Sequence, residues 1–376
     1  MPVLKGIRAL ARCLPGGPQD DANVVGNAAL VWEGDTIRWV GPEALLPAAY
    51  RALPTEDAGG RLVIPGLIDC HTHLAFGGWR AEEFVRRLRG ATYLEIAASG
   101  GGIASTVSQT RAASREQLVA GCRSHLAGMA RLGVTTVEAK SGYGLTLEAE
   151  LRLLDVYREL ADGPQRILAT LLAAHVVPPE FHDRRDHYVA LIVEQLIPRV
   201  AGEALASFCD VFVEQSAFTI EEARRILEAG KLHGLRPKLH ADQLTDGGGA
   251  KLAAEVSAIS ADHLEQVSER GMAAMRAAGV VAVSLPFASL YLNVAPLPAR
   301  RLLELGVPVA VATDFNPGSA PSYHLPMAMT LACTLQRMTP AEALKGATIV
   351  AARALGLDPE AGSLEEGKSA DFAIID

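Results

Sequence analysis

The sequence has no segment that would carry the chain into a membrane or out of the cell. Among its 376 residues, no apolar run reaches the roughly 18 residues of a membrane-spanning helix. Residues 1–14 include basic side chains but no continuous apolar stretch like that of a signal peptide. The sequence therefore predicts a cytoplasmic protein that does not enter a membrane.

A surplus of positive charge is also missing. The net charge is −8, and acidic and basic residues are interspersed along the chain. No basic cluster with interleaved aromatic residues occurs, although such clusters are typical of nucleic-acid grooves. We therefore expect a small-molecule partner and no nucleic acid.

Cysteine is scarce and scattered. The five cysteines never form a C-x-x-C pair, and they stand at positions 13, 70, 122, 209 and 333. An odd number at wide spacing fits neither a disulfide framework nor a zinc knuckle. We expect reduced thiols in the core.

Short apolar runs alternate with longer amphipathic stretches after residue 61. The runs expected to be strands are 62–68, 134–139, 167–174, 211–213, 237–239, 258–261, 280–285 and 307–312. The stretches expected to be helices include 115–132, 147–160, 187–200 and 220–232. Eight strands alternating with helices predict an α/β fold of the TIM (β/α)8 barrel type. A doubly wound open sheet is the second choice, because no G-x-G-x-x-G motif follows the first run.

Both ends of the chain have the pattern of β-structure. Runs 28–32 and 36–40 flank Glu33-Gly34-Asp35, which is a hairpin signal. Residues 362–376 are β-like again and stop abruptly. We expect a small β-sandwich built from residues 1–61 and 356–376, around a barrel domain of residues 62–355. The C-terminal part of this sandwich is expected to be truncated.

Ionisable residues follow nearly every predicted strand. They are His71, His73, Glu138, Lys140, His175, Glu214, His240, His263 and Asp314. The C-terminal ends of the strands form the active-site face of a TIM barrel. On the expectation that the barrel interior is apolar, these side chains must converge on one pocket.

Four of these residues have the character of metal ligands. In the sequence His71-Thr72-His73 both imidazoles point to the same side of a strand, because side chains repeat every second residue. With His240 and Asp314 they make a nitrogen and oxygen site suited to a divalent metal. The other histidines, at 125, 182, 187, 233 and 324, are interpreted as structural.

Several segments resemble a known family. Residues 63–73 (VIPGLIDCHTH) and 362–371 (GSLEEGKSAD) resemble the two signatures of the amidohydrolase superfamily. More specific segments resemble the imidazolonepropionase family within it, and they cover residues 76–80 (FGGWR), 138–145 (EAKSGYGL), 174–180 (AHVVPPE), 240–244 (HADQL) and 312–319 (ATDFNPGS). The resemblance extends over nearly the whole chain.

The resemblance implies an activity and a set of site residues. Members of the family use a metal-activated water to open the ring of 4-imidazolone-5-propanoate, which gives N-formimidoyl-L-glutamate in histidine degradation. The implied metal ligands are His71, His73, His240 and Asp314, which would hold one Zn²⁺ or Fe³⁺ per chain. The implied substrate-binding residues are Arg80, Tyr143, His175, Gln243, Asn316, Gly318 and Ser319. The implied catalytic residues are His263 and Asp314, and the expected assembly is a homodimer.

Chemistry supports one of these roles independently. The substrate carries a carboxylate, and a planar guanidinium such as that of Arg80 can bind a carboxylate through two hydrogen bonds. The amides of Gly318 and Ser319, together with Asn316, are expected to supply further donors.

One residue departs from the family pattern. Gln243 stands where related enzymes carry a glutamate that moves protons, and a glutamine side chain has no titratable proton. Proton transfer is therefore expected to fall to Asp314 or His263. The alternative function is another mononuclear amidohydrolase, such as a cyclic-amide hydrolase or a nucleobase deaminase, and a non-catalytic metal-binding barrel is a further one.

Overall fold

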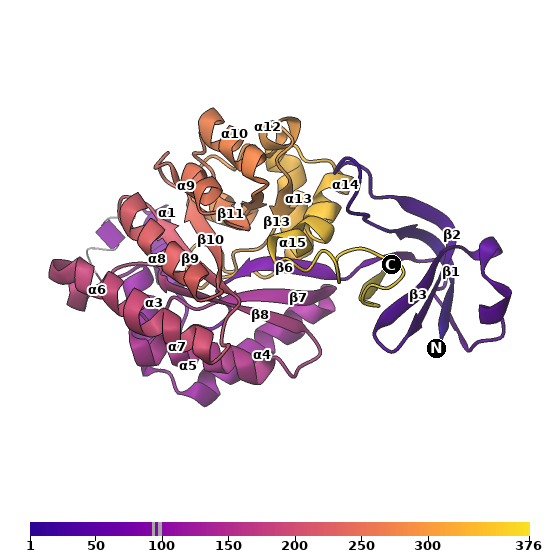
Figure 1. Ribbon diagram of the computed structural model, residues 1–376, viewed down its shortest axis with the longest axis horizontal. Helices are drawn as coiled ribbons and strands as arrows, with labels where there is room; N and C mark the ends of the chain where they lie inside the picture. Colours follow the sequence, from indigo (N-terminus) through magenta and orange to yellow (C-terminus); the bar gives the residue numbers. More distant parts are fainter. Residues whose placement is uncertain (92–94, 97–99) are drawn as a thin grey trace.

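The computed structural model describes residues 1–91, 95–96 and 100–376, and their strands form two separate sheets. Figure 1 shows a barrel surrounded by helices at one end of the molecule and a small sheet at the other. The small sheet contains the N-terminus, and the C-terminal strand joins it. The fold is thus a TIM-like barrel with a small β-unit built from both chain ends, as the sequence predicts, and the described strands of this unit form one sheet where a sandwich was expected.

The small sheet has the strand order β14-β5-β1-β2-β3, with β4 paired to β1. Its strands are β1 (Val3–Ala11), β2 (Val24–Glu33), β3 (Thr36–Pro42), β4 (Thr55–Asp57), β5 (Leu62–Pro65) and β14 (Phe372–Ile375). The predicted hairpin is confirmed as β2 and β3, and β14 runs antiparallel to β5. A compact apolar cluster fills one face of this sheet and includes Leu4, Leu30, Ile37 and Val63.

The second sheet contains eight parallel strands in chain order. They are β6 (Leu67–Thr72), β7 (Val134–Lys140), β8 (Arg166–Ala174), β9 (Phe208–Val213), β10 (Arg236–Ala241), β11 (Ser260–His263), β12 (Val281–Ser284) and β13 (Val309–Val311). The eight predicted runs are therefore found. The first prediction was too long, because run 62–68 divides at Gly66 between β5 of the small sheet and β6 of the barrel.

The seam between the first and last barrel strands is closed by residues just beyond β13. The Asp314 amide donates to the His71 carbonyl at 3.0 Å, and the His73 amide donates to the Phe315 carbonyl at 2.8 Å. The amide and hydroxyl of Thr313 both donate to the Asp69 carboxylate. The seam therefore holds Asp314 beside both histidines of β6.

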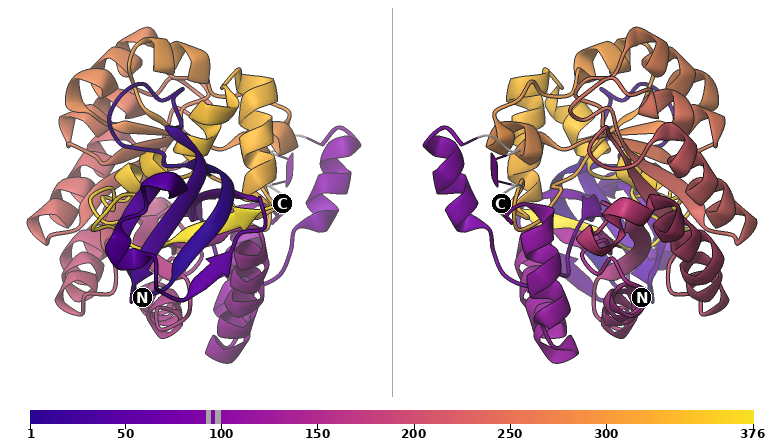
Figure 2. Two further views of the ribbon diagram at one scale, coloured as in Figure 1. Left: turned by 90° about the vertical axis from the view of Figure 1, so that its right-hand side faces the viewer. Right: turned by 90° about the vertical axis from the view of Figure 1, so that its left-hand side faces the viewer.

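Helices surround the barrel sheet (Figure 2). The α-helices are α1 (Ala81–Leu88), α3 (Ile103–Ala112), α4 (Arg115–Arg131), α5 (Leu147–Leu160), α6 (Arg185–Leu191), α7 (Ile197–Gly202), α8 (Ile220–Leu232), α9 (Gly249–Glu255), α10 (Glu269–Ala278), α11 (Pro286–Leu292), α12 (Ala299–Glu304), α13 (Leu325–Gln336), α14 (Pro340–Gly346) and α15 (Ile349–Ala354). The short elements are η1 (Glu43–Leu45), η2 (Ala48–Tyr50), η3 (Pro179–Arg184) and the π-helical turn η4 (Ile192–Leu196).

Local sequence explains where several helices begin. Ser114 and Gln117 form a reciprocal capping box at the start of α4, and Thr219 and Glu222 do the same for α8. Predicted helices 147–160 and 220–232 coincide with α5 and α8, whereas 187–200 is interrupted by η4. None of the helices in the described part of the chain is long and apolar enough to span a membrane.

The interior of the barrel is charged, which contradicts the expectation of an apolar filling. Glu138, Lys140, Asp210, Lys238 and Asp262 are all fully or almost fully buried there. The Lys140 ammonium lies 2.8 Å from Glu138 Oε1 and 2.8 Å from Asp210 Oδ2. Opposite charges inside the barrel compensate one another, so a polar residue on a strand need not reach the active-site pocket.

Candidate metal centre and active site

The first two predicted ligands come from β6 and the residue after it. His71 is completely buried, and its Nδ1 lies 2.6 Å from Asp262 Oδ2. An ionised carboxylate can only accept a hydrogen bond, so Nδ1 carries a proton, and in the neutral ring Nε2 keeps its lone pair. His71 Nε2 has no hydrogen-bond partner among the described residues. An imidazole held in this way is prepared to bind a metal through Nε2.

His240 repeats this arrangement on β10. Its Nδ1 lies 3.1 Å from the carboxylate of Asp210, and its Nε2 has no partner among the described residues. The ring centroids of His71 and His240 are 4.6 Å apart, and that of His73 lies 5.5 Å from each. Three imidazoles from two strands thus surround one point.

Asp314 supplies the carboxylate at the same point. Its Oδ1 lies 3.5 Å from His71 Nε2 and 3.4 Å from His73 Nε2. Possible ligand atoms of His71, His73 and His240 lie within 4.8 Å of one another, as do those of His71, His263 and Asp314. The unpartnered, buried nitrogens and the nearby carboxylate fit a single metal ion held by imidazole and carboxylate.

The protein environment shifts the pKa values of these groups in different directions. Burial raises the pKa of Asp314, but His71 and His73 outweigh it and hold this pKa well below its usual range. Burial lowers the pKa of His240 to about 3, although Asp210 opposes the shift. Burial and Lys140 lower the pKa of His71, yet Asp262 and Asp314 raise it overall to about 9 when no metal is bound. A cation arriving at the centre must therefore displace a proton from His71.

Two acidic or basic residues at strand ends are engaged elsewhere. The Lys140 ammonium is surrounded by carboxylates inside the barrel. The Glu214 carboxylate accepts hydrogen bonds from the amides of Leu244 and Thr245 and from the Thr245 hydroxyl. Glu214 therefore fastens the loop after β10, and the groups of possible ligands found among the described residues do not include it.

His175 and Tyr143 line one side of the centre. The His175 ring stacks on His73 with centroids 5.1 Å apart, and the Tyr143 ring lies 5.6 Å from His73. His175 Nδ1 lies 3.0 Å from the Gly142 carbonyl, so Nδ1–H donates and Nε2 is an acceptor. Burial, with the nearby His73 and His240, lowers the pKa of His175 well below its usual value. His175 is therefore neutral.

The loop that carries Tyr143 wraps around one buried carboxylate. Glu150 accepts hydrogen bonds from the amides of Gly142, Gly144 and Leu145, the shortest at 2.7 Å. Gly142 has a φ of +101°, a conformation that favours glycine. Glu150 thus fixes the loop that carries Tyr143, a contact that sequence reasoning missed, and its signal is a glutamate on the buried face of α5.

His263 is held by an unusual backbone. It follows Asp262 at the end of β11, and both His263 and Leu264 have positive φ, at 78° and 66°. Such conformations cost free energy in residues other than glycine and cluster at functional sites. The His263 ring lies 5.4 Å from His240, and its Nδ1 is 3.6 Å from Glu265 Oε1.

Arg80 stands at the start of α1 and packs on the loop that follows Asp314, where its amide donates to the Pro317 carbonyl at 3.1 Å. Its guanidinium lies directly over Gly318, where an added Cβ would come within 1.2 Å of Nη2. Only glycine leaves this space, so Gly318 permits the position of Arg80. Arg80 is 9% exposed, and its Nε makes no hydrogen bond among the described residues but lies 3.9 Å from Glu83 Oε2.

In the loop after β13, backbone amides donate hydrogen bonds to a side chain of the same loop. The amides of Gly318 and Ser319 both donate to Asn316 Oδ1 at 2.8 Å. Asn316 Nδ2 donates to the Asp314 carbonyl and to the Ser319 hydroxyl. The prediction that these two amides are free donors was therefore wrong. Asn316 shapes the loop that carries Gly318. Gln243 is half-buried on the loop after β10.

Asp210 and Asp262 are the other residues that sequence reasoning missed. Each contacts a predicted ligand through Nδ1, Asp262 at His71 and Asp210 at His240. For Asp210 the available signal was an acidic residue inside an otherwise apolar strand, FCDVFV in β9, whereas Asp262 lies in the polar strand SADH of β11, which offers no such signal.

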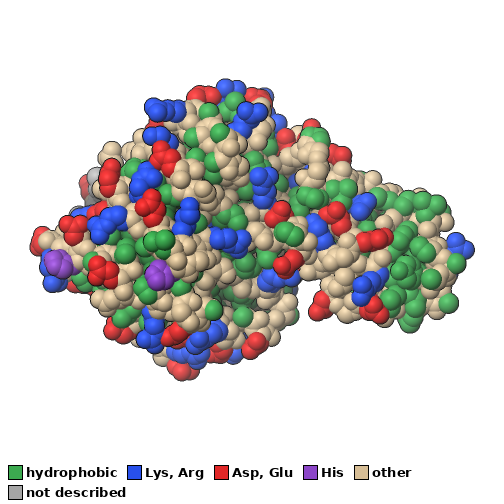
Figure 3. Space-filling view, viewed as in Figure 1, with side chains coloured by type: hydrophobic (Ala, Val, Ile, Leu, Met, Phe, Trp, Pro, Cys, Tyr) green, Lys and Arg blue, Asp and Glu red, His purple; other side chains and the backbone are tan. Residues whose placement is uncertain are grey.

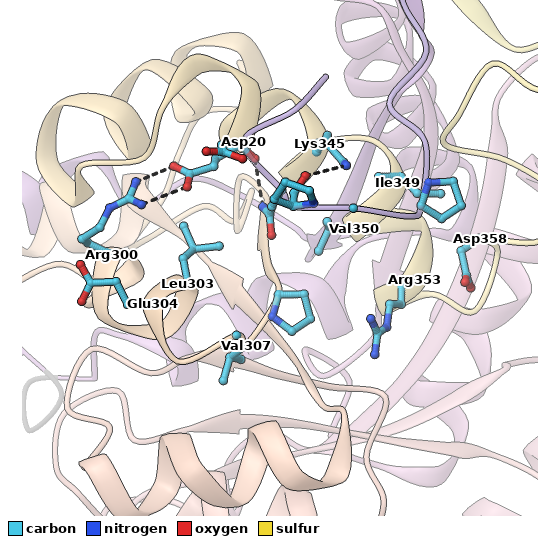
Figure 4. Close-up of a pocket in the computed structure, with 17 residues that line it drawn as sticks. Asp20, Arg300, Leu303, Glu304, Val307, Lys345, Ile349, Val350, Arg353 and Asp358 are labelled. Carbon is cyan, nitrogen blue, oxygen red and sulfur yellow. Dashed lines mark hydrogen bonds and ion pairs between the residues drawn. The ribbon is translucent and has the colours of Figure 1, made fainter. Parts of the chain in front are cut away.

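A cavity of about 600 Å³ lies at the opposite end of the barrel (Figure 4). It borders Gly306–Pro308, which precede β13, whereas the metal centre follows the strands. Its cations are engaged, because Arg300 pairs with Glu342 and the Lys345 ammonium donates to the Pro18 carbonyl. The cavity is therefore separate from the candidate active site.

Sequence comparison identifies relatives along most of the chain. Residues 62–376 match the amidohydrolase family. An imidazolonepropionase of Geobacillus thermodenitrificans is 51% identical over 95% of this chain and 85% of its own length. Those of Cupriavidus pinatubonensis and Polaromonas sp. are 49% and 47% identical, over 98% and 99% of this chain and 87% and 89% of their own lengths.

Solved structures share the fold at much lower identity. A triazine hydrolase variant superposes with a TM-score of 0.77 at 17% identity, over 99% of this chain and 86% of that one. An adenosine deaminase from Xanthomonas campestris with bound zinc gives 0.74 at 19% identity, over 100% and 84%. The chain belongs to the amidohydrolase family and, within it, to the imidazolonepropionases.

Proposed function

We propose that this protein hydrolyses 4-imidazolone-5-propanoate to N-formimidoyl-L-glutamate in histidine degradation. The observation that carries the proposal is a nearly buried arginine packed on Gly318, four residues after Asp314, which itself lies at a centre of unpartnered imidazole nitrogens. Such an arrangement suits a small substrate that carries one carboxylate and one ring carbonyl. The imidazolonepropionases that match most of this chain support the same choice.

The residues proposed to hold one metal ion are His71, His73, His240 and Asp314. When bound, the ion would activate a water molecule and polarise the ring carbonyl. Zinc and iron both suit three imidazoles and a carboxylate, and we propose Zn²⁺ or Fe³⁺. The supporting observation is that Asp262 and Asp210 direct two Nε2 lone pairs towards the same point.

The substrate is proposed to bind between the arginine and the metal centre. Arg80 would hold the carboxylate, while Tyr143, His175 and Gln243 would contact the ring through their hydroxyl, imidazole and amide groups. Asn316, Gly318 and Ser319 contribute through the shape of the loop under Arg80. His175 is neutral, so its Nε2 can accept a ring N–H.

Asp314 is proposed to carry the proton, and His263 is proposed to stabilise the charge that develops during the reaction. Asp314 lies next to His71 and His73, and its lowered pKa keeps the carboxylate ionised, so that its oxygen is available to take the proton of a metal-activated water. His263 faces the same centre and can stabilise charge that develops on the ring carbonyl oxygen. The leaving ring nitrogen then receives the proton from Asp314.

A deaminase of the same fold is the second candidate. Deaminases occur among the solved structures that share the fold. A deaminase would use a carboxylic acid at position 243, where this chain has glutamine. Arg80 also favours an acidic substrate over a neutral nucleobase.

The remaining predictions concern location, ligand class and assembly. They are a cytoplasmic location, no nucleic-acid ligand and a homodimer. Figure 3 shows acidic and basic side chains intermixed on the visible face, which supports a small-molecule substrate over a nucleic acid. A single chain does not test the homodimer, and analytical ultracentrifugation of the purified protein would decide it.

The test is a direct assay with product identification. Purified protein supplied with zinc or iron is incubated with 4-imidazolone-5-propanoate, and in parallel with adenosine and cytosine. N-Formimidoyl-glutamate should appear in the first reaction and no ammonia in the others. Deamination of a nucleobase without hydrolysis of the imidazolone would overturn the proposal.

A further inference from the structure

Two buried lysines occupy the barrel interior, and they have different neighbours. Both ammonium groups are completely shielded from solvent. Lys140 Nζ lies 2.8 Å from Glu138 Oε1, 2.8 Å from Asp210 Oδ2 and 3.5 Å from Asp262 Oδ2. Lys238 Nζ lies 3.3 Å from Glu138 Oε2 and 3.4 Å from the Ala354 carbonyl. Of the two lysines, only Lys140 forms ion pairs with Asp210 and Asp262, the carboxylates that reach towards the metal centre, whereas Lys238 acts on Asp262 through its charge at longer range.

These two carboxylates connect Lys140 with two imidazoles. Asp210 accepts from Lys140 and contacts His240 Nδ1, and Asp262 lies between Lys140 and His71 Nδ1. Asp262 is further fixed by the Ser260 hydroxyl at 2.6 Å. The five side chains come from β6, β7, β9, β10 and β11, so one ammonium group ties together the inner faces of five barrel strands.

We propose that Lys140 is the positioning residue of the metal centre, a fixed cation that holds Asp210 and Asp262 where they orient His240 and His71. Lys140 is not one of the proposed ligands or substrate-binding residues, and it acts through the two carboxylates. Partners beyond the ligands commonly determine how tightly a site binds metal. The inference rests on the proposed function only for the identity of the centre, because its test measures metal binding and not turnover.

The strand register explains why a lysine on β7 can serve ligands on β6 and β10. Glu138 and Lys140 occupy alternate positions of β7 and so point to the same side, into the barrel. The four-carbon stem of lysine carries its charge to the level of the carboxylates. Three carboxylates and two ammonium groups share this space, so removing one ammonium leaves excess negative charge with nothing to hold it in place.

The test compares matched substitutions of the two lysines. Lys140→Met and Lys238→Met each remove one buried charge of the same kind and preserve much of the volume. Metal-free proteins are titrated with Zn²⁺ against a competing chelator. Lys140→Met should bind zinc on the order of 10–100-fold more weakly than the parent. Lys238→Met should stay within a few-fold of the parent.

A second pair of variants covers the risk of misfolding. Glu138→Gln/Lys140→Met and Glu138→Gln/Lys238→Met each remove one positive and one negative charge, so the net charge of the interior is unchanged. Circular dichroism and thermal unfolding establish that each variant is folded. The visible spectrum of the Co²⁺-loaded protein then reports ligand geometry, and only the Lys140 variant should change it.

Three results would overturn the proposal. Equal losses of zinc affinity in the Lys140 and Lys238 variants would assign the effect to buried charge in general. Unchanged affinity and an unchanged cobalt spectrum in the Lys140 variants would show that the carboxylates hold their positions without it. If both Lys140 variants fail to fold while both Lys238 variants fold, Lys140 serves barrel stability instead. Absence of imidazolone hydrolysis in the parent would contradict the proposed function and leave this comparison intact.

Discussion

The two sheets of this molecule enclose different kinds of side chains. The small sheet packs around an apolar cluster that includes Leu4, Leu30 and Val63. The barrel instead encloses buried carboxylates and ammonium groups, which continue into the cluster of imidazoles at the strand ends. The difference indicates that the small sheet serves stability, whereas the barrel interior prepares a site. Substitutions in the two regions should therefore fail in different ways.

The largest effect is expected when an imidazole is removed from the centre. In His71→Ala the ion loses one ligand, and Asp262 loses its hydrogen-bonding partner. We expect loss of bound metal and a fall in kcat/KM greater than the roughly 10³-fold that removal of a single oxyanion donor costs. Metal content by elemental analysis and steady-state kinetics measure this. A metal-replete, active variant would show that His71 is not a ligand.

His263→Asn tests a residue that is not needed to complete the four-ligand set. The variant should keep its metal and lose about 10²–10⁴-fold in kcat, as is typical for an acid–base or oxyanion group. If the metal is lost as well, His263 is a ligand and the proposed set is wrong. Normal turnover with normal metal content would make His263 a bystander and leave proton transfer to Asp314.

A substitution in the small sheet should separate stability from chemistry. Leu30 is completely buried in the apolar cluster, and Leu30→Ala should cost about 2–5 kcal/mol of unfolding free energy. Because the cluster is remote from the metal centre, kcat, KM and metal content of the folded protein should be unchanged. Chemical denaturation and kinetics on the same sample test both statements. A large fall in kcat with an intact fold would contradict the statement that the small sheet contributes only to stability.

Arg80→Ala should give the smallest of these effects. The carboxylate of the substrate lies away from the bond that is broken, so this contact contributes mainly to binding. Losing a charge-assisted hydrogen bond costs about 1.5–3 kcal/mol, which should appear as a higher KM with kcat nearly preserved. Arg89→Ala, at an exposed arginine just beyond α1, is the control and should behave like the parent. An unchanged KM in Arg80→Ala would remove Arg80 as the carboxylate anchor.

The sequence predicted the barrel well because local patterns of apolar and polar residues indicate its strands and helices. Helices α5 and α8 coincide with their predicted ranges, and α8 begins with a capping box. The metal-ligand candidates were accessible for a similar reason, since His71-Thr72-His73 fixes two side chains on one face of a strand. Asp314 could be placed only in part, because the seam contacts that bring it to β6 join residues about 240 positions apart.

The charged interior could not be predicted from the same patterns. Asp210 stands in a strand that is otherwise apolar, whereas Lys140 and Lys238 stand in strands with other polar residues. The burial of all three is tolerable only because long-range partners compensate each charge. The roles of the Gly318 and Ser319 amides were also misjudged. Whether an amide is free depends on the turn that Asn316 makes, and hydrogen bonding within a loop is not visible in residue types.

The central claim is that one metal ion, held by the residues at the ends of the barrel strands, is required for hydrolysis of the imidazolone. The most direct measurement is a titration of metal-free protein with Zn²⁺ while the hydrolysis of 4-imidazolone-5-propanoate is followed. The account predicts no turnover without metal, a rise proportional to added zinc, and a plateau at one ion per chain. Full turnover in metal-free protein, or a plateau that requires two ions per chain, would contradict it.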